Sequence, residues 1–394
     1  MRFLVVGSGF AGAVLAREIA DHSEHHVDVV EARDHIGGNC YTEKESETGV
    51  TVHRYGAHIF HTSNLDVWKY IHRFTEMMPF INRPKASIEK GIFSLPVNLH
   101  TINQFYAKKF SPLEARQFID AIRRQDITEP QNFEEQALHF MGEDLYRAFF
   151  HGYTKKHWGC EPREIPASVL KRLPLRFNYN DNYYSSLYQG IPKGGYTAIF
   201  ERLLDHPRLS LTLNHRWQPD DGRSYDHVFY SGPLDGFHGH RRGRLGYRTV
   251  FWEEHIETGD VLGHPGINFP SMDVSFTRRR EHKHYEYWKQ FDKSIVFTEY
   301  SKETGLEDEP YYPKRLTADK ALMNDYLSDC MQTERTSFMG RLGLYTYMDM
   351  HQVIAESLSL ARDFITAIAA GQPRPIFPEG FRRQLVASGS RLRP

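Results

Sequence analysis

The sequence predicts an α/β protein in which a helical domain and an antiparallel β-sheet domain are inserted into a domain built on parallel strands. Three observations support this class. The chain opens with a β-branched strand, a glycine-rich turn and a helical pattern; capped helices follow, and strands rich in β-branched and aromatic residues fill the second half. Its 394 residues exceed what one hydrophobic core usually serves, so two or three domains are expected.

The first strand, turn and helix have the pattern of a Rossmann-like dinucleotide-binding domain. Residues 3–6 predict a buried parallel strand, and residues 13–20 predict the helix after the turn. Between them, Gly7, Gly9 and Gly12 form G-x-G-x-x-G, which allows a tight turn, a pyrophosphate against the backbone and close helix–strand packing. The N–H groups at the start of this helix would point at the phosphates.

The second strand identifies the cofactor class more closely. Residues 27–30 are a predicted strand that ends at Glu31, 19 residues beyond Gly12, where a ribose-binding carboxylate belongs. The following "EARDHIGGN" resembles the extended flavoprotein pattern, so FAD is favoured over NAD. The predicted cofactor contacts in these two motifs are Gly7, Gly9, Phe10, Ala11, Gly12, Glu31, Ala32, Arg33, Gly38 and Asn39.

Composition narrows the function classes. The formal net charge is -1, so no global field favours nucleic acid or a membrane surface. Nothing approaches the ~18 consecutive apolar residues of a membrane-spanning helix. Three cysteines, far apart and odd in number, do not form a disulfide framework and suit a reducing cytoplasm.

Later elements are predicted from caps and from alternation. Ser111 to Glu114 and Asn132 to Glu135 begin helices, and an apolar stripe from Leu138 to Phe149 follows the second start. Strands are predicted within residues 208–215, 227–235, 246–256 and 293–301, and a last helix runs from a capping box at Asp349 to Gly371. We predict a discontinuous FAD-binding domain (1–78, 193–243 and 318–371), a helical domain with a mobile lid (98–172), an antiparallel sheet and substrate domain (79–97, 173–192 and 244–317) and an irregular tail (372–394).

Seven longer motifs point to one family. They are, in order, "YGAHIFHTSN", "FHGYTKKHWG", "IPASVLKRLPLRFNYNDNYY", "YQGIPKGGYT", "FTRRREHKHY", "EPYYP" and "GRLGLYTYMDM". Together they closely resemble the bacterial UDP-galactopyranose mutase family, over residues 1 to about 371. One departure is Ala57, where the family commonly has proline before the histidine.

The resemblance implies a redox-neutral isomerase. Members interconvert UDP-galactopyranose and UDP-galactofuranose, supply galactofuranose for cell-surface polysaccharide, and are usually homodimers. N5 of reduced FAD is the nucleophile on the anomeric carbon, and UDP is the leaving group.

Two arginines match the family's diphosphate contacts. Arg172 lies in the "EIPASVLKRLP" lid motif and Arg278 on a predicted strand, and both are expected to stabilise the charge of departing UDP. The neighbouring Arg279 and Arg280 are interpreted as solvated or structural.

The resemblance also implies substrate contacts. Tyr153 is the candidate to stack on uracil, with Phe150 on the same face; a place for both rings in the helical core is the alternative. Trp158 belongs to the lid region, and the weaker candidates are Asn82 and Asn268. Tyr183, Tyr312 and Tyr347 match hydroxyls that contact diphosphate, although a one-residue shift would select Tyr184 and Tyr311 instead.

The remaining candidates lie near the flavin. His58 matches a histidine beside flavin and sugar, and it favours galactose, because the variant that accepts N-acetylgalactose has arginine there. Arg341 matches a contact to the FAD pyrophosphate. The start of the last helix at Asp349 and Met350, after Tyr347, would point at the flavin, although Asp349 could act only as a helix cap.

Three alternatives stay open from the sequence. The pairs His238/His240 and His282/His284 could ligate a metal, but no cysteine or carboxylate stands at ligand spacing, so no metal is predicted. An FAD amine oxidase or desaturase shares the opening glycine motifs but not the paired arginines and the lid. A flavin-binding protein without turnover is the third.

Overall fold

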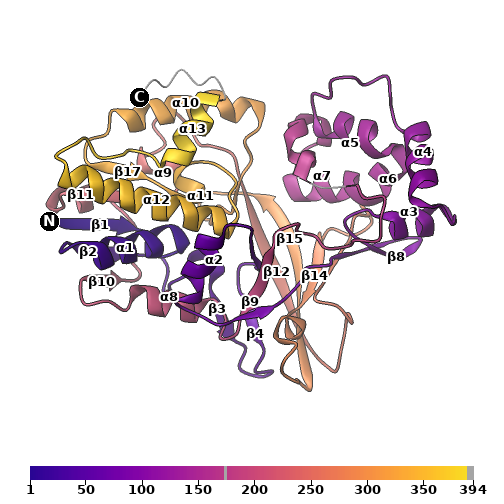
Figure 1. Ribbon diagram of the computed structural model, residues 1–394, viewed down its shortest axis with the longest axis horizontal. Helices are drawn as coiled ribbons and strands as arrows, with labels where there is room; N and C mark the ends of the chain where they lie inside the picture. Colours follow the sequence, from indigo (N-terminus) through magenta and orange to yellow (C-terminus); the bar gives the residue numbers. More distant parts are fainter. Residues whose placement is uncertain (173–174, 388–394) are drawn as a thin grey trace.

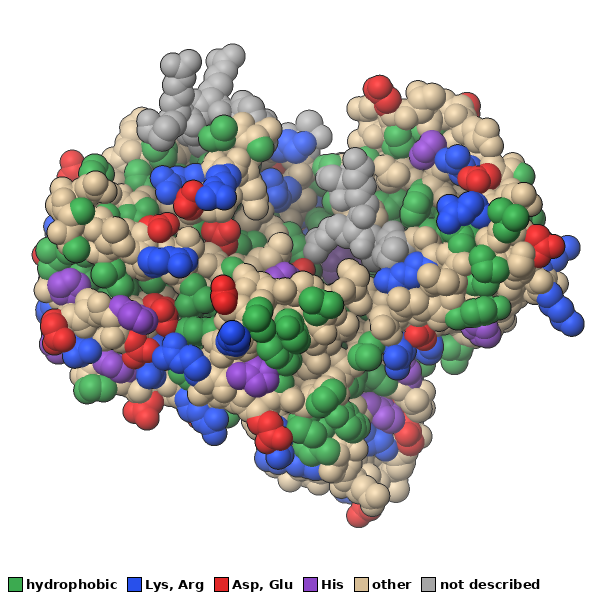
Figure 2. Space-filling model, in the orientation of Figure 1, with side chains coloured by type: hydrophobic (Ala, Val, Ile, Leu, Met, Phe, Trp, Pro, Cys, Tyr) green, Lys and Arg blue, Asp and Glu red, His purple; other side chains and the backbone are tan. Residues whose placement is uncertain are grey.

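The computed structural model describes residues 1–172 and 175–387, apart from the side chains at positions 168, 171, 172, 317 and 318. Figure 1 shows a parallel-sheet domain on one side and a helical domain on the other, with strands of a long sheet between and below them. The space-filling view is hollowed between the two upper parts (Figure 2).

The parallel sheet has five strands, and every neighbouring pair is parallel. Val5 lies opposite Val29 and Phe229, so the apolar run predicted as a buried strand stands in the centre of the sheet. Helices α1 (Phe10–His22) and α12 (Met350–Ala369) pack against each other beside it. The strand order is β10 (Leu209–Thr212), β2 (His26–Val30), β1 (Arg2–Val6), β11 (His227–Tyr230) and β17 (Thr336–Phe338).

The predictions for the first strand and helix are confirmed, and both elements are longer than predicted. Helix α1 begins at Phe10, three residues before the predicted Ala13, because the Gly9 carbonyl already accepts from the Ala13 N–H at 2.9 Å. The predicted last helix is also confirmed: α12 begins after Asp349, whose backbone N–H donates to Gln352 Oε1 at 2.8 Å in the expected capping box.

The helical domain lies between two segments of sheet in the sequence. Its capping box is as predicted, since the Ser111 N–H donates to Glu114 Oε2 at 2.8 Å. The predicted apolar stripe is divided by Gly142, whose φ of +81° ends one helix before the next begins. The elements are α3 (Leu99–Tyr106), α4 (Pro112–Ile122), α5 (Phe133–Met141), α6 (Glu143–Tyr146), the π-helical turn η2 (Arg147–His151), α7 (Gly152–Trp158), η3 (Pro162–Glu164) and η4 (Ala167–Arg172).

The largest sheet has seven strands and separates the two domains (Figure 1). Its neighbours are antiparallel, except that β13 pairs with β7 in parallel. The order is β16 (Tyr312–Pro313), β12 (Tyr247–Thr258), β15 (Lys293–Glu303), β14 (Arg278–Glu281), β13 (Gly266–Asn268), β7 (Lys85–Ile88) and β8 (Gly91–Ser94).

Two small sheets complete the connections. Strand β9 (Tyr188–Pro192) lies in a range assigned to the substrate domain, yet it pairs with β5 (Phe60–Thr62) and β6 (Met77–Pro79). The other small sheet joins β3 (Thr42–Lys44) and β4 (Thr51–His53). Further helices are η1 (Gly38–Cys40), α2 (Leu65–His72), α8 (Thr197–Leu204), η5 (Pro219–Ser224), α9 (Leu234–Phe237), η6 (His282–Glu286), α10 (Thr317–Met331) and α11 (Gly340–Gly343).

The prediction of an irregular tail was wrong over residues 379–387, which form helix α13 (Glu379–Ala387). Phe377, Phe381 and Leu385 are buried, and they join the core that contains Phe338. Phe381 and Leu385, four residues apart, lie on one side of α13, a signal that the prolines and arginines around them obscure. Over the described residues, no helix is both long and apolar enough to cross a membrane.

Candidate functional site

The turn after β1 is packed so closely that only glycine fits. A Cβ atom at Gly12 would overlap the carbonyl oxygen of Gly7 and stand 2.9 Å from Val5 Cγ1. Gly7 has a φ of +99°, and a Cβ there would overlap Ser231 Oγ on the neighbouring strand end. Gly7 and Gly12 therefore bring β1, the turn and α1 into close contact, as the motif predicts, whereas a Cβ at Gly9 would make only an ordinary 3.7 Å contact with Gly38 Cα.

A second pair of glycines lies against the first motif. Gly37 and Gly38 have φ values of +92° and +54°, and a Cβ at Gly38 would stand 3.2 Å from Gly9 Cα. We call Gly7, Gly9, Gly12, Gly37 and Gly38 the glycine cradle. Backbone without side chains at the start of a helix suits a phosphate-bearing cofactor.

Glu31 is held beside the cradle by three donors. Its Oε2 accepts from the Ser8 N–H at 2.9 Å and from Ser8 Oγ at 2.8 Å, and its Oε1 accepts from the Arg33 N–H at 3.0 Å. The side chain of Arg33 donates from Nη2 to Asn39 Oδ1 at 2.9 Å and stacks over Tyr55 at 4.3 Å. The carboxylate and guanidinium are thus fixed where the predicted cofactor contacts Ala32 and Asn39 also lie.

Helix α11 connects the cradle with a large cavity. A Cβ at Gly340 would stand 2.9 Å from Ala11 Cβ, so α11 packs directly on the start of α1. The next residue, Arg341, lines the cavity; its Nη2 donates to the Met348 carbonyl at 2.7 Å, and its guanidinium lies 4.8 Å from the Tyr347 ring centroid.

The cavity has a volume of about 1460 Å³ and is lined by the helical domain, the seven-stranded sheet, the loop before β5 and the start of α12. Figure 2 shows a hollow between the same parts of the molecule. Its size suits a nucleotide-sized ligand. The predicted site residues on its wall are His58, Asn82, Phe150, Tyr153, Trp158, Tyr183, Asn268, Arg278, Tyr312, Arg341, Tyr347, Asp349 and Met350. The side chain of Arg172 lies outside the part of the chain that the structure describes.

A row of polar side chains crosses the sheet in the cavity floor. Strand register places Arg278 of β14 opposite Asn268 of β13 on one side and Glu299 of β15 on the other. Arg278 Nε donates to Glu299 Oε1 at 2.6 Å, and Thr277 Oγ1 donates to the same oxygen at 3.0 Å. Burial opposes the Arg278 charge, but Glu299 raises its pKa well above the usual value. The guanidinium is therefore preorganised on a strand, as predicted, with its Nη groups available to a ligand.

Aromatic rings form the wall above this row. The rings of Tyr153 and His157 stack at 5.9 Å, His157 meets Tyr312 at 5.4 Å, and Tyr312 stacks on Tyr347 at 6.2 Å. Burial lowers the pKa of His157 to about 4, so this imidazole is neutral at pH 7. Phe150 lies in the π-helical turn η2, one turn before Tyr153, and both rings reach the cavity.

The structure separates the adjacent tyrosines that the sequence left open. Tyr312 lines the cavity, whereas Tyr311 is buried and packs against Tyr55 and Trp252. Tyr183 and Tyr184 both line it.

His58 is held in a loop that is fixed from both sides. Its N–H donates to His53 Nδ1 at 3.2 Å, and its carbonyl accepts from Tyr196 OH at 3.2 Å. Burial, together with the charges of Arg341 and Arg278, lowers the pKa of His58 to about 4. His58 lines the cavity, and its imidazole is neutral at pH 7.

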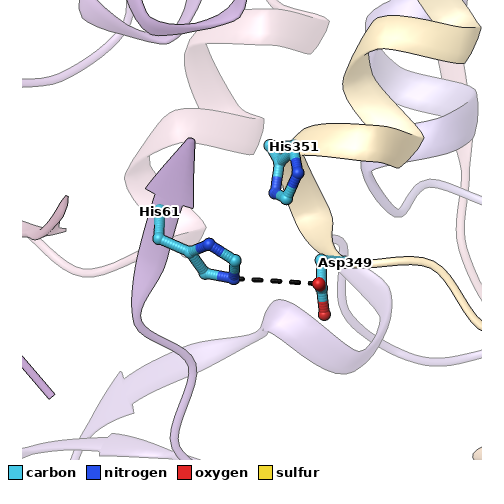
Figure 3. A group of neighbouring side chains, drawn as sticks. All are labelled: His61, Asp349 and His351. Carbon is cyan, nitrogen blue, oxygen red and sulfur yellow. Dashed lines mark ion pairs between the residues drawn. The ribbon is translucent and has the colours of Figure 1, made fainter. Parts of the chain in front are cut away.

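His61, Asp349 and His351 meet at the start of α12 (Figure 3). His61 Nε2 lies 3.8 Å from Asp349 Oδ2, and its ring meets the His351 ring at 4.9 Å. His61 also bonds Ser186 Oγ at 3.0 Å. Because Asp349 also caps the helix, these contacts fix the N-terminus of α12 against β5 at the edge of the cavity.

One of the histidine pairs considered for metal binding has carboxylates near it that the sequence spacing does not reveal. His284 Nε2 lies 3.2 Å from Asp260 Oδ1 and 3.3 Å from Glu281 Oε2. The hydrogen bond that His284 donates to Glu281 raises the pKa of the imidazole, as expected for an ion pair. The prediction that no metal binds stays a prediction.

Lys156 fixes the loop after Asn268. Burial lowers its pKa to about 8. Its Nζ donates at 2.7–3.0 Å to four backbone carbonyls, those of Phe269, Ser271, Val274 and Phe276. This contact holds the β13–β14 loop to α7, which carries Tyr153.

Sequence reasoning missed several residues of the wall. Glu299 gave no local signal, because its role depends on strand register with Arg278. His157 is one helical turn from Tyr153, a spacing that could have indicated it. Arg280, interpreted as solvated or structural, lines the cavity.

Fold and site together define a class: a dinucleotide-binding α/β enzyme whose cofactor cradle leads into a cavity lined with arginine and tyrosine. The protein-family model described as UDP-galactopyranose mutase matches residues 148–347 of the chain. The family model described as an NAD(P)-binding Rossmann-like domain matches residues 5–74. A probable UDP-galactopyranose mutase of Klebsiella pneumoniae is 48% identical, over 95% of this chain and 97% of its own. The chain belongs to the UDP-galactopyranose mutase family and is an isomerase.

Two further comparisons add to this. A dTDP-fucopyranose mutase of Escherichia coli is 45% identical, over 92% of this chain and 98% of its own. A crystal structure of reduced UDP-galactopyranose mutase shares the fold, with a TM-score of 0.71, 15% identity and 97% coverage of both chains. The predicted fold class and family are confirmed. A dTDP-sugar was not among the predicted substrates.

Proposed function

We propose that this isomerase interconverts UDP-galactopyranose and UDP-galactofuranose, with reduced FAD as its cofactor, and that it supplies galactofuranose for cell-surface polysaccharide. The observation that carries the proposal is the continuity of cradle and cavity: Arg341 follows the α11 contact to Ala11 and stands beside Tyr347 and Tyr312. A cofactor in the cradle would reach the cavity at this point.

The residues present fit FAD. The cradle has room only for backbone, and Glu31 stands at the end of β2 where a ribose would lie. Arg33 Nη1 is buried, and among the described residues it has no hydrogen-bond partner, so it is available to a cofactor oxygen. When bound in its reduced form, the flavin supplies the nucleophilic nitrogen N5 for the anomeric carbon.

The cavity residues would hold the nucleotide. Tyr153 and Phe150 offer faces for uracil, and Trp158 lies on the same wall. Arg278, Tyr312 and Tyr347 would bind the diphosphate, with Tyr183 and Asn82 also on the wall. As UDP departs, fixed cations and hydroxyls stabilise its growing charge in a site that needs little rearrangement. We propose that Arg172 joins them when the lid closes over the nucleotide.

Two groups would act at the reacting centre. Neutral His58, which lines the cavity, would stand beside the sugar and the cofactor. The N-terminus of α12, a 20-residue helix, lines the cavity at Asp349 and Met350, and its positive dipole end favours an anionic ligand.

The test is incubation of the dithionite-reduced protein with UDP-galactofuranose, followed by chromatography. We expect conversion to UDP-galactopyranose with no reductant consumed in proportion to product. The oxidised protein is the control and should be far less active. Hydrogen peroxide formed in step with product, or equal turnover by the oxidised protein, would contradict the proposal.

A second candidate substrate is dTDP-fucopyranose, because one relative at 45% identity is named for it. The two differ in the base, the ribose and the sugar C6 substituent. Turnover of both nucleotide sugars by the same preparation decides between them: we expect the higher kcat/KM for UDP-galactofuranose. N-acetylgalactose should be the poorer sugar if His58 favours plain galactose.

A cytoplasmic homodimer is also proposed. Its support is the free state of Cys40, Cys160 and Cys330, which suits a reducing compartment, and the family resemblance for the dimer. Light scattering of the holoenzyme at a mass near twice 46.0 kDa would bear out the dimer, and a monomer mass would exclude it.

A further inference from the structure

Arg280 differs from the other arginine of strand β14 in its partners. It stands two residues after Arg278, on the same face of the strand and about 6.7 Å further along. Arg278 is paired with Glu299, whereas Arg280 lies opposite Phe297. Within the described part of the chain no carboxylate lies in ion-pair distance of Arg280, and its side chain donates from Nη1 to Tyr285 OH at 3.4 Å.

A glycine makes room for this guanidinium. Gly266 lies opposite Arg280 on β13, and a Cβ there would overlap Arg280 Nη1 and stand 2.9 Å from its Cδ. Tyr285 completes the seat; it is buried, and its hydroxyl donates to the Pro265 carbonyl at 2.9 Å. The Tyr285 oxygen can therefore accept from Arg280. The Arg280 guanidinium thus lies against the backbone of β13 at Gly266, with no carboxylate in ion-pair distance among the described residues.

A cation in this position calls for oxygen atoms from a ligand. Arginine presents five N–H donors, and a partly buried charge is costly unless those donors are bonded. Arg280 lines the cavity, so a ligand can reach it. His58 lines the same cavity.

The order of groups on the wall indicates which part of the ligand this is. Tyr312 of β16 lies opposite Arg248 of β12, and Arg248 in turn lies opposite Glu303 of β15. Further along β15, Glu299 lies opposite Arg278 and Phe297 lies opposite Arg280. The wall therefore presents Tyr312, Arg278 and Arg280 in succession. In a nucleotide sugar the hexose follows the diphosphate, so a diphosphate held by Tyr312 and Arg278 places the hexose beside Arg280 and His58.

We propose that Arg280 is a substrate-contacting residue that binds the hydroxyl oxygens of the transferred hexose. This rests on the proposed function, because the assignment of Arg278 to the diphosphate comes from it. Arg280 would separate sugar binding from nucleotide binding: UDP alone does not fill its donors, whereas UDP-galactose does. Its preference is for sugars that carry oxygen where it makes contact.

The experiment compares two ligands on the oxidised holoenzyme. Dissociation constants for UDP and for UDP-galactose are measured by calorimetry in wild type and in Arg280→Met. We expect the UDP value to stay within about twofold and the UDP-galactose value to rise at least tenfold. Arg280→Lys should recover part of the loss. The matched control is Arg279→Met, which by strand alternation lies on the opposite face and should change neither value.

A second variant displaces the Arg280 guanidinium without removing its charge. Gly266→Ala displaces the guanidinium, so it should also weaken UDP-galactose and leave UDP unchanged, with flavin content and melting temperature recording whether the protein is intact. Equal weakening of both ligands would assign Arg280 to the diphosphate and overturn the proposal. Unchanged binding of both ligands, or loss of flavin from Arg280→Met, would also overturn it.

Failure of the proposed function gives a different pattern. A wild-type protein that binds UDP-galactose but does not turn it over when reduced contradicts the function, and the binding comparison still decides the role of Arg280. A wild type that turns over, with no difference between the two ligands in Arg280→Met, contradicts only the role of Arg280.

Discussion

The glycine cradle and the cavity are built in opposite ways. The cradle comes from residues 7–38 and consists of backbone brought so close that a single Cβ at Gly12 would overlap Gly7. The cavity is made of side chains from the helical domain, the seven-stranded sheet and the start of α12. The first site therefore depends mainly on local conformation, and the second on how distant segments are placed.

The largest expected effect is at the cradle. Gly12→Val should abolish flavin binding, because the new side chain meets backbone that cannot yield without separating α1 from β1. The measurement is flavin absorbance of the purified protein, which should be yellow in wild type. Gly194→Ala is the control, since its Cβ would make only an ordinary 3.7 Å contact with Ala198. A yellow Gly12→Val protein would show that the cradle does not hold the cofactor.

The next effect is in the cavity floor. Arg278→Ala should lower turnover by roughly 10²–10³-fold, the cost of losing one preorganised electrostatic contact to a developing charge. Arg278→Lys should recover little, because a point charge cannot reproduce the planar fork held by Glu299. Steady-state kinetics and flavin content are measured together. Normal flavin is expected, and near-wild-type turnover would remove Arg278 from the site. The same loss is predicted for Arg172→Ala.

A smaller effect is expected where the uracil base of UDP stacks on Tyr153. Tyr153→Ala should weaken UDP binding by ~1–3 kcal/mol, by analogy with base–aromatic stacking. Calorimetric titration with UDP provides the value. The control is Tyr179→Ala, which removes an exposed ring that does not line the large cavity. Equal UDP affinity in wild type and Tyr153→Ala would leave this ring as part of the helical core only.

The smallest effect is the response of the cavity wall to acid. Burial holds the pKa of His157 at about 4, below the ordinary 6.5, so the unfolded chain takes up the proton first as pH falls. Its contribution to stability is complete above pH 6.5 and is lost progressively toward pH 4; at pH 5.5 the loss is about 1.4 kcal/mol. Urea unfolding at pH 7 and pH 5.5 measures it. His157→Phe should respond less to pH than wild type, and an identical response would contradict the assignment.

The sequence by itself determined the elements whose geometry is local. The glycine spacing set the β1–α1 turn, because a Cβ at Gly12 would overlap the carbonyl oxygen of Gly7, five residues earlier. The capping boxes at Ser111 and Asp349 likewise fixed two helix starts through bonds three residues apart. The family motifs named most of the cavity wall, although not the contacts that hold it.

Tertiary structure decided which face each side chain presents and what it meets. Arg278, Arg279 and Arg280 form one run of like residues, and only their register against Glu299 and Phe297 distinguishes a paired cation from an unpaired one. Pairing across strands joins residues about twenty positions apart, and no local pattern encodes it. The same reason explains the tail, where Phe381 became helical through burial against a core contributed by distant strands and helices. Local rules set the backbone of the cradle, while long-range packing set the chemistry of the cavity.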